Sequence, residues 1–363
     1  MAEAMHDVVV IGAGPAGLAA AMFAARRGLK TVIVSKDLGG QLALTEWIEN
    51  YPGVDRAGGR ELCERFLAQA KRDGAEFRLV EAIGIEPSPP RPPSKEGGKQ
   101  KSISPPPSGR GSERGWVVRL AEGDAITTKT IILAFGLTPN DLGCEGEQRL
   151  KGKGVYYSAV DDAPKQNGKT VAVVGGGNSA VTAVLELASR AAKVLLIHRR
   201  IELRAEKALL ERMRALSNVE VLTPYTVAAL TGEDHVRAIV LAHAEAGENK
   251  NFSPSHRVGE FAGVGTRRLT VDSVFVQIGY SAKTKWLEGA VQLNEKREVI
   301  VDRDCRTSAS GIFAAGDLTD IAYKQAAISV GEGVKAALQV FKYLQGIAGK
   351  PAVLFDWDVR GKL

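Results

Sequence analysis

The sequence predicts an α/β protein with two Rossmann-like three-layer domains, one inserted into the other. Two observations support this prediction. A strand-like apolar run, a glycine-rich turn and a helical pattern follow one another near the N-terminus, and the same order recurs in the middle of the chain. The length of 363 residues also allows two domains, each with a core of its own.

The first of these units starts with the β-branched run of residues 7–11, followed by an alanine-rich helical pattern to about residue 27 and a second strand at 31–34. Between strand and helix, Gly12, Gly14 and Gly17 form GxGxxG, which allows a tight turn, a close approach of a pyrophosphate, and close packing of helix on strand. Pro15 and Ala16 lie inside this motif. The uncharged run 8–25 contains three of these glycines and a proline, so we interpret it as strand, turn and helix and predict neither a membrane span nor a targeting segment.

The second unit has strands at 170–174 and 193–197 and a helix from 178 to about 191. Its turn fits GxGxxA, and we expect it to bind a second dinucleotide through Gly175, Gly177, Asn178, Ser179 and Ala180. The end of the next strand indicates which one. An NAD site places an acid there for the ribose 2′-hydroxyl, whereas this chain has the cationic residues His198, Arg199, Arg200 and Arg204. NADPH is therefore predicted in preference to NADH.

Near the other end, residues 311–317 read GIFAAGD, an apolar strand that ends in a carboxylate. With the first glycine motif, this segment resembles the low-molecular-weight thioredoxin reductases of the class II pyridine nucleotide-disulfide oxidoreductases, and matching motifs run from residue 8 to 337. The resemblance implies FAD in the first unit and a homodimer. It also implies that the flavin contacts a further set of residues: Gly40, Gln41, Asn50, Gly316, Asp317, Lys324, Gln325 and Ala326. A cytoplasmic location is predicted separately, because three cysteines far apart in the sequence indicate a reduced protein.

One family feature is missing. After GKGV at 152–155 the family carries a CxxC dithiol, but here Ser158 and Asp161 stand at the two cysteine positions. Disulfide exchange needs a thiolate, so the internal dithiol relay is excluded and no catalytic residue is assigned with certainty. Asp162 matches the family acid/base aspartate, but in the absence of the thiols a helix-capping role is favoured for it.

The cysteines are Cys63, Cys144 and Cys305, which lie far apart and form neither a disulfide framework nor a metal site. We expect each to be a buried, inert thiol. A redox role for any of them is the alternative.

The domain boundaries follow from these motifs. Residues 1–149 and 278–363 are predicted to form the FAD domain and 150–277 the NADPH domain, with hinges near Gly146 and Gly279. The segment 87–115 holds 8 of the 15 prolines, six basic residues and two acidic ones. It therefore carries most of the net charge of +6 and reads as an expanded hairpin loop, not as evidence for nucleic-acid binding. Residues 245–268 are predicted to form another long hairpin.

The predicted function is electron transfer from NADPH through FAD to an external acceptor. An acidic carrier such as ferredoxin or flavodoxin, drawn by the basic loop, is the first candidate. The alternatives are a disulfide acceptor, oxygen as in NAD(P)H oxidases, and a slow-turnover redox sensor. The tail after residue 349, with Phe355 and Trp357, reads as a docked surface strand, with stacking over the flavin as the alternative.

Overall fold

The computed structural model describes residues 5–45, 47–89, 115–244 and 266–352. The chain divides into two compact units, one formed by residues 1–137 with 282–363 and the other by 138–281. The boundaries predicted from the sequence, 149/150 and 277/278, thus differ from these by 12 and 4 residues. The predicted basic loop, apart from its ends, and the C-terminal tail lie outside the described residues.

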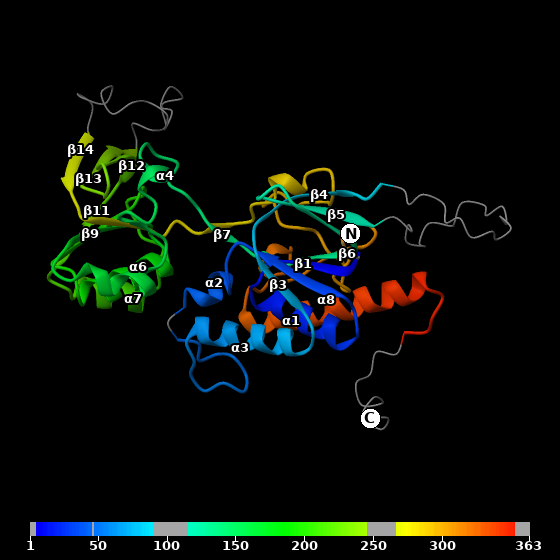
Figure 1. The fold of residues 1–363 in the computed structure, drawn as a ribbon. Helices are drawn as coiled ribbons and strands as arrows, with labels where there is room; N and C mark the ends of the chain where they lie inside the picture. Colours follow the sequence, from blue (N-terminus) through cyan, green and yellow to red (C-terminus); the bar gives the residue numbers. More distant parts are fainter. Residues whose placement is uncertain (1–4, 46, 90–114, 245–265, 353–363) are drawn as a thin grey trace. The chain divides into compact units, whose positions relative to one another are not determined.

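A seven-stranded sheet forms the centre of the first unit (Figure 1). Its strand order is β3-β2-β1-β6-β5-β4, and β17 pairs with β6 beside β5. The strands β3, β2, β1, β6 and β17 are parallel, whereas β5 pairs antiparallel with both of its neighbours, β4 and β6. The bounds are β1 His6–Ile11, β2 Thr31–Ser35, β3 Glu76–Leu79, β4 Ala82–Pro87, β5 Trp116–Leu120, β6 Ala125–Leu133 and β17 Ile312–Ala314.

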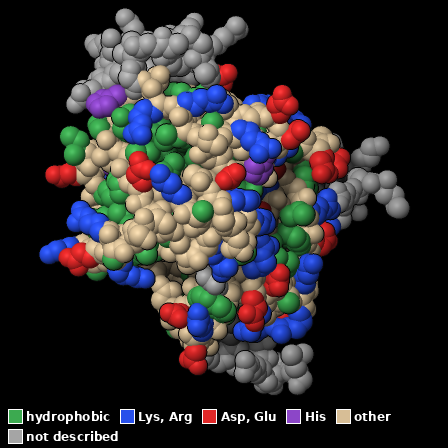
Figure 2. Space-filling model, turned by 90° about the vertical axis from the view of Figure 1, so that its left-hand side faces the viewer, with side chains coloured by type: hydrophobic (Ala, Val, Ile, Leu, Met, Phe, Trp, Pro, Cys, Tyr) green, Lys and Arg blue, Asp and Glu red, His purple; other side chains and the backbone are tan. Residues whose placement is uncertain are grey.

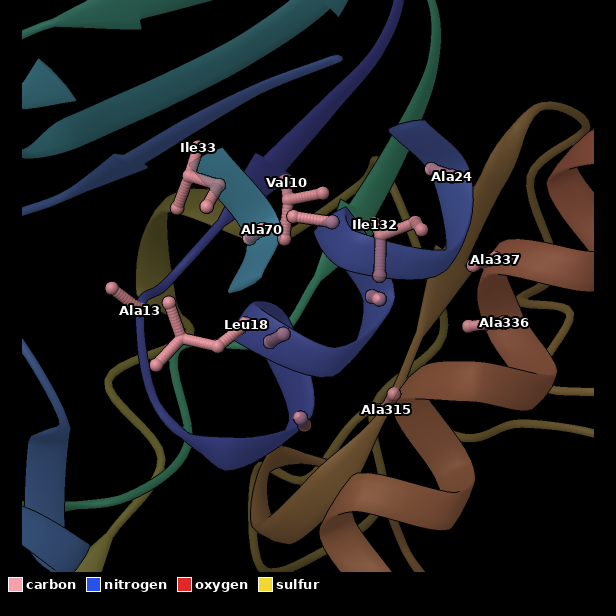
Figure 3. Packing of buried hydrophobic residues seen from close by; sticks show 14 of the residues in the cluster. Val10, Ala13, Leu18, Ala24, Ile33, Ala70, Ile132, Ala315, Ala336 and Ala337 are labelled. Atoms are coloured by element: carbon pink, nitrogen blue, oxygen red, sulfur yellow. The ribbon is translucent and has the colours of Figure 1, made fainter. Parts of the chain in front are cut away.

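One face of this sheet is covered by three helices, α1 (Pro15–Arg26), α3 (Gly59–Arg72) and α8 (Ala326–Ile347). Figure 3 shows Val10, Ile33 and Ile132, which share one register row of β1, β2 and β6, pointing toward α1. The helices meet through small side chains. A Cβ added at Gly333 of α8 would lie 2.0 Å from the Ala16 carbonyl oxygen of α1. This close approach draws the first turn of α1 and the start of α8 into one region.

The opposite face is covered by the β4-β5 hairpin and the segment that returns from the second unit. The register pairs Pro87 with Trp116, so the Pro-rich segment does connect two antiparallel strands, as predicted. Residues of the returning segment, among them Leu287 and Val299, are fully buried against Ile131 and Leu133. The first unit therefore has three layers.

The second unit is built on a five-stranded parallel sheet of order β11-β10-β9-β15-β8. Its strands are β8 Val155–Tyr156, β9 Thr170–Val174, β10 Lys193–Ile197, β11 Val219–Leu222 and β15 Ser273–Val276. The central strands β9, β10 and β15 are buried on both faces, which explains their nearly continuous apolar runs. Helices α5 (Ala159–Asp162), α6 (Asn178–Ala188) and α7 (Lys207–Arg214) cover one face.

An antiparallel sheet of order β12-β13-β14 covers the other face. Its strands are β12 Tyr225–Thr231, β13 Ala238–His243 and β14 Thr266–Thr270. The second predicted hairpin exists as the β13–β14 pair, but its loop was predicted too long, because β14 already starts at Thr266. Both units thus have three layers around a parallel sheet, which confirms the predicted fold class.

The remaining elements are short: α2 Gly40–Ala43, β7 Thr138–Pro139, α4 Glu147–Leu150, β16 Tyr280–Ser281, and the 3₁₀ turns η1 Ala163–Gln166, η4 Lys285–Leu287 and η5 Gly316–Leu318. Within the described ranges, no helix is both long enough and apolar enough to cross a bilayer. In the view of Figure 2, hydrophobic side chains form small separate areas among charged and polar ones.

Candidate functional site

The GxGxxG turn of the first unit connects β1 to α1. Gly12 has φ +111°, and a Cβ there would lie 2.5 Å from the Ala134 carbonyl oxygen at the end of β6. A Cβ at Gly17 would lie 1.9 Å from the Gly12 carbonyl oxygen. By contrast, a Cβ at Gly14 would come no closer than 3.9 Å to any neighbour. The first and third glycines are therefore required by packing, while the second leaves open space in front of the N-terminus of α1.

Helix α1 starts at Pro15, which has no backbone N–H to satisfy, and Ala16 is buried in the same first turn. A helix N-terminus presents unpaired N–H groups and the positive end of the helix dipole. The loop with the sequence GGQ at residues 39–41 lies against this turn, since the Gly39 N–H donates to the Ala13 carbonyl oxygen at 2.8 Å. Gly39 and Gly40 both have positive φ. The geometry here fits the pyrophosphate of a dinucleotide.

The GIFAAGD carboxylate lies beside the start of α8. Asp317 follows β17 and accepts a hydrogen bond from the Ser329 hydroxyl at 3.0 Å. Gly316 has φ +77°, and a Cβ there would lie 2.8 Å from the Ala16 Cβ, so β17 ends directly against α1. The structure thereby brings Asp317 together with the GxGxxG turn, although the two are some 300 residues apart in sequence.

Lys324 uses its ammonium group within the protein. Its Nζ donates to the carbonyl oxygens of Asp317, at 3.1 Å, and Thr319, and lies 3.1 Å from Glu298 Oε1. Burial alone would raise the pKa of Glu298, but hydrogen bonds from Asn294 and Lys324 outweigh it and lower this pKa. The lysine side chain therefore fixes the loop before α8 and leaves the backbone of Gln325 and Ala326 as the part that could face a ligand.

Asn50 and Gln41 are two further residues predicted to contact the flavin, and both bind other segments of the first unit. The Asn50 Nδ2 donates to Gln325 Oε1 at 3.3 Å, which joins the loop at residues 49–53 to the residue preceding α8. The Gln41 Nε2 donates to the Leu137 carbonyl oxygen at 3.3 Å. Asn50 is thus more than a turn residue, because its side chain connects two segments of the first unit.

The second glycine turn connects β9 to α6. A Cβ at Gly175 would lie 2.2 Å from the Gln277 carbonyl oxygen, and Ala180 is fully buried in the third motif position. Gly177 has open space where a Cβ would stand, and Asn178 and Ser179 are exposed in the first turn of α6. This arrangement repeats the division of roles in the first turn.

His198 packs flat on this turn. A Cβ at Gly176 would lie within 2.7 Å of three atoms of the His198 ring. The ring is 6% exposed, and its Nε2 has no hydrogen-bond partner in the described part of the chain. Burial, followed by the charges of Arg204, Arg199 and Arg200, lowers the pKa of His198 below its usual value. The lowered pKa favours the neutral imidazole, so the positive charge at the end of β10 comes from the arginines that follow.

The three arginines after β10 are exposed, and no described carboxylate forms a salt bridge with them. The Arg204 N–H donates to the Gly176 carbonyl oxygen at 2.6 Å. Asn178 forms two hydrogen bonds with Glu206, one from its Nδ2 to Oε1 at 2.7 Å and one to its Oδ1 from the Glu206 N–H at 2.8 Å. Residues 198–206, called the arginine loop below, are therefore attached to the glycine turn at two points. The guanidinium groups of this loop are available to an anion.

The position of the missing dithiol lies between β8 and α5. Ser158 precedes α5, and the side chain of Asp161 lies outside the described residues. The Asp162 carboxylate accepts from Lys165 Nζ at 2.7 Å and makes no capping bond to η1. The favoured helix-capping role of Asp162 is therefore wrong for its side chain, because Lys165, one turn later, takes the carboxylate.

The residue before Ser158 is held by a polar cluster that the sequence did not predict. The Tyr157 hydroxyl lies 2.8 Å from Asp141 Oδ1 and 2.9 Å from Glu147 Oε1, and Lys151 Nζ lies 2.9 Å from the same Asp141 oxygen. Burial and the two carboxylates raise the pKa of Tyr157. Burial opposes ionisation of Asp141, but the hydrogen bonds from Lys151, Tyr157 and Gln148 lower its pKa overall. This cluster fixes the loop 141–147 against β8.

The three cysteines are buried and free, as predicted. Burial raises the pKa of the Cys63 and Cys144 thiols to about 12. Burial and the neighbouring Glu332, whose Oε2 lies 3.0 Å from the sulfur, also raise the pKa of Cys305. Thiols with such pKa values hold almost no thiolate at neutral pH, so none has the environment of a reactive cysteine.

Two glycine turns, each at the carboxyl ends of parallel strands, are typical of a protein that binds two dinucleotides. The family model for pyridine nucleotide-disulphide oxidoreductases matches residues 6–333. The chain belongs to this family. Family membership implies FAD and a nicotinamide dinucleotide. The tight turns at Gly12, Gly17 and Gly175, where an added Cβ would meet backbone atoms, fit the binding of both.

Relatives within the family include a component of the alkyl hydroperoxide reductase of Pseudomonas putida, 37% identical over 343 residues, and its counterpart in Staphylococcus aureus, 36% identical over 340 residues. The matches cover 94% and 93% of this chain but 59% of each relative, so the chain spans less than two thirds of their length.

Among solved structures, thioredoxin reductase of Lactococcus lactis aligns with TM-score 0.72 and 26% identity, covering 94% of this chain and 99% of that one. Thioredoxin reductase of T. acidophilum aligns with TM-score 0.69 and 28% identity, covering 95% and 100%. The chain is thus similar to thioredoxin reductases over nearly its whole length.

Proposed function

We propose that the chain is an FAD-dependent oxidoreductase that takes electrons from NADPH and passes them directly to an external acceptor. The observation that supports NADPH is the cluster of Arg199, Arg200 and Arg204, cations without a described carboxylate partner beside the second glycine turn. A ribose 2′-phosphate would supply the missing anion, whereas a 2′-hydroxyl would leave the charges unpaired.

The protein's own residues bind and orient. Gly12 and Gly17 hold the first turn tight, so that the N-terminus of α1 faces one pyrophosphate, and Gly175 and Ala180 do the same for α6. Asp317 stands ready to bind a hydroxyl group beside the start of α8. When both cofactors are bound, the flavin would accept a hydride from the nicotinamide and supply the electrons for the acceptor.

Direct transfer from the flavin to the acceptor is proposed because no reactive dithiol stands between them. Neither Ser158 nor Asp161 can form a mixed disulfide, and the three cysteines are buried with raised pKa values. We infer that the acceptor is an acidic electron carrier such as ferredoxin or flavodoxin. A disulfide substrate, oxygen and slow sensing are the competing outcomes. The homodimer, the hinges and the cytoplasmic location stay predictions.

Two measurements test this proposal. Anaerobic stopped-flow reduction of the flavin by NADPH and by NADH gives the donor, and faster, tighter reduction by NADPH is expected. A flavin that stays oxidised for minutes would instead indicate a sensor.

Steady-state assays with ferredoxin, flavodoxin, thioredoxin and oxygen give the acceptor. Repeating them with residues 88–114 deleted, at low salt, tests the basic loop. Ferredoxin reduction that is unchanged by the deletion would reject a role for this loop in docking the acceptor.

A further inference from the structure

Beyond the arginine loop, a second strand places a cation at the same end of the parallel sheet. Strand β12 starts at Tyr225, directly after β11, and the Tyr225 N–H donates to the His198 carbonyl oxygen at 2.9 Å. The carboxyl ends of β10 and β11 are where an open α/β sheet binds its ligand. The hydrogen bond to His198 places Tyr225, which is half-buried, beside the end of β10 where the arginines begin.

The register of the antiparallel sheet brings Arg267 to Tyr225. Tyr225 pairs with His243, and Leu241, two residues before His243, pairs with Arg267. Because side chains alternate along a strand, all four lie on one face. The Arg267 Cζ lies over the Tyr225 ring, 5.8 Å from its centroid, and the His243 ring meets the tyrosine edge-on, 5.5 Å away. The tyrosine thus holds the guanidinium by a cation–π contact.

Arg267 is exposed, and no carboxylate in the described ranges forms an ion pair with it. Its neighbour Arg268 differs. Arg268 points to the other face of β14, where its Nη2 donates to the Thr231 hydroxyl at 3.4 Å. The chain therefore carries two adjacent exposed arginines of equal charge, of which only Arg267 lies over Tyr225, the residue hydrogen-bonded to His198 at the end of β10.

We propose that Arg267 is a specificity-determining residue for the donor. It adds a fourth cation to the subsite of the 2′-phosphate, from a different layer than Arg199, Arg200 and Arg204, and Tyr225 positions it. This inference rests on the proposed use of NADPH. Its ligand class is an adenosine with phosphates at both the 2′ and 5′ positions.

The test compares Arg267→Gln with Arg268→Gln, using adenosine 2′,5′-bisphosphate and 5′-AMP as probes in calorimetric titrations of the flavin-loaded protein. Arg267→Gln should weaken the bisphosphate roughly tenfold, as expected for one charge-assisted contact, and leave 5′-AMP unchanged. Arg268→Gln should change neither affinity by more than about twofold, as usual for surface substitutions. Tyr225→Leu should reproduce the loss, and Tyr225→Phe should restore the affinity, since the ring and not the hydroxyl holds the guanidinium.

Three outcomes decide the matter. An Arg267→Gln protein that binds the bisphosphate like the wild type, or equal losses in the Arg267 and Arg268 variants, would overturn the role of Arg267 while leaving NADPH use intact. A wild-type protein that binds 5′-AMP as tightly as the bisphosphate would overturn the proposed donor itself.

Discussion

Replacement of Gly17 by alanine tests the packing that shapes the first glycine turn, residues 12–17. The added Cβ would lie 1.9 Å from the Gly12 carbonyl oxygen and 3.0 Å from its carbonyl carbon. Both are backbone atoms, so no side chain can rotate away, and α1 must move off β1. Overpacking typically costs about 1–3 kcal/mol. Because the obstacle here is rigid backbone under a fully buried layer, we expect a loss of roughly 3 kcal/mol, the upper end of that range.

Gly14→Ala is the matched control. Its φ is −80°, and its nearest obstacle is the Gly39 carbonyl oxygen at 3.9 Å, so an alanine fits the protein. Its methyl group would instead occupy the space in front of α1 where a pyrophosphate approaches. Urea unfolding followed by far-ultraviolet circular dichroism, with and without flavin, and the flavin absorbance of each purified protein separate the two effects. We expect Gly17→Ala to be destabilised even without flavin, and Gly14→Ala to fold normally but bind flavin weakly. A Gly17→Ala protein within about 0.5 kcal/mol of wild type would refute this packing argument.

Three further predictions concern the arginine loop, His198 and the cysteine thiols. Changing Arg199 and Arg200 together to glutamine should raise the KM for NADPH roughly tenfold or more and leave that for NADH nearly unchanged; equal increases in steady-state assays would contradict the 2′-phosphate site. The pKa of His198 is lowered in the folded state, so the unfolded chain takes up a proton first as pH falls below the usual histidine value of about 6.5. Stability conferred by this group is therefore present above that pH and lost below it, and urea unfolding of His198→Asn should show a flatter dependence between about pH 7 and 5. With the pKa of Cys63 about 12 and the other two thiols also buried, native protein should react with a thiol reagent far more slowly than urea-unfolded protein, and rapid labelling of the native state would show an accessible thiolate.

Much of the architecture could be predicted because its signals are local. The strands at 170–174 and 193–197 appear with the predicted bounds, and the first helix ends within a residue of its expected end. Continuous β-branched runs and glycine turns define these elements without reference to distant residues. The family resemblance, carried by GxGxxG and GIFAAGD, is confirmed by the match over residues 6–333.

The parts that sequence reasoning missed depend on pairing between distant segments. Arg267 lay inside a stretch interpreted as loop, and its position over Tyr225 follows only from the registers of β12, β13 and β14. The Tyr157 cluster likewise unites residues from separate elements. The Asp162 interpretation failed because a capping position in sequence does not reveal that Lys165 competes for the carboxylate.

The attachment of the arginine loop to the glycine turn has a consequence for redesign of the coenzyme preference. Gly176 accepts from the Arg204 N–H, and Asn178 is joined to Glu206 by two hydrogen bonds. A loop from an NADH-using enzyme that replaces Glu206 by an apolar residue would leave the Asn178 side-chain amide without its carboxylate partner. A redesigned loop should therefore keep the glutamate at this position and the backbone course at residue 204, so that it stays attached to the glycine turn.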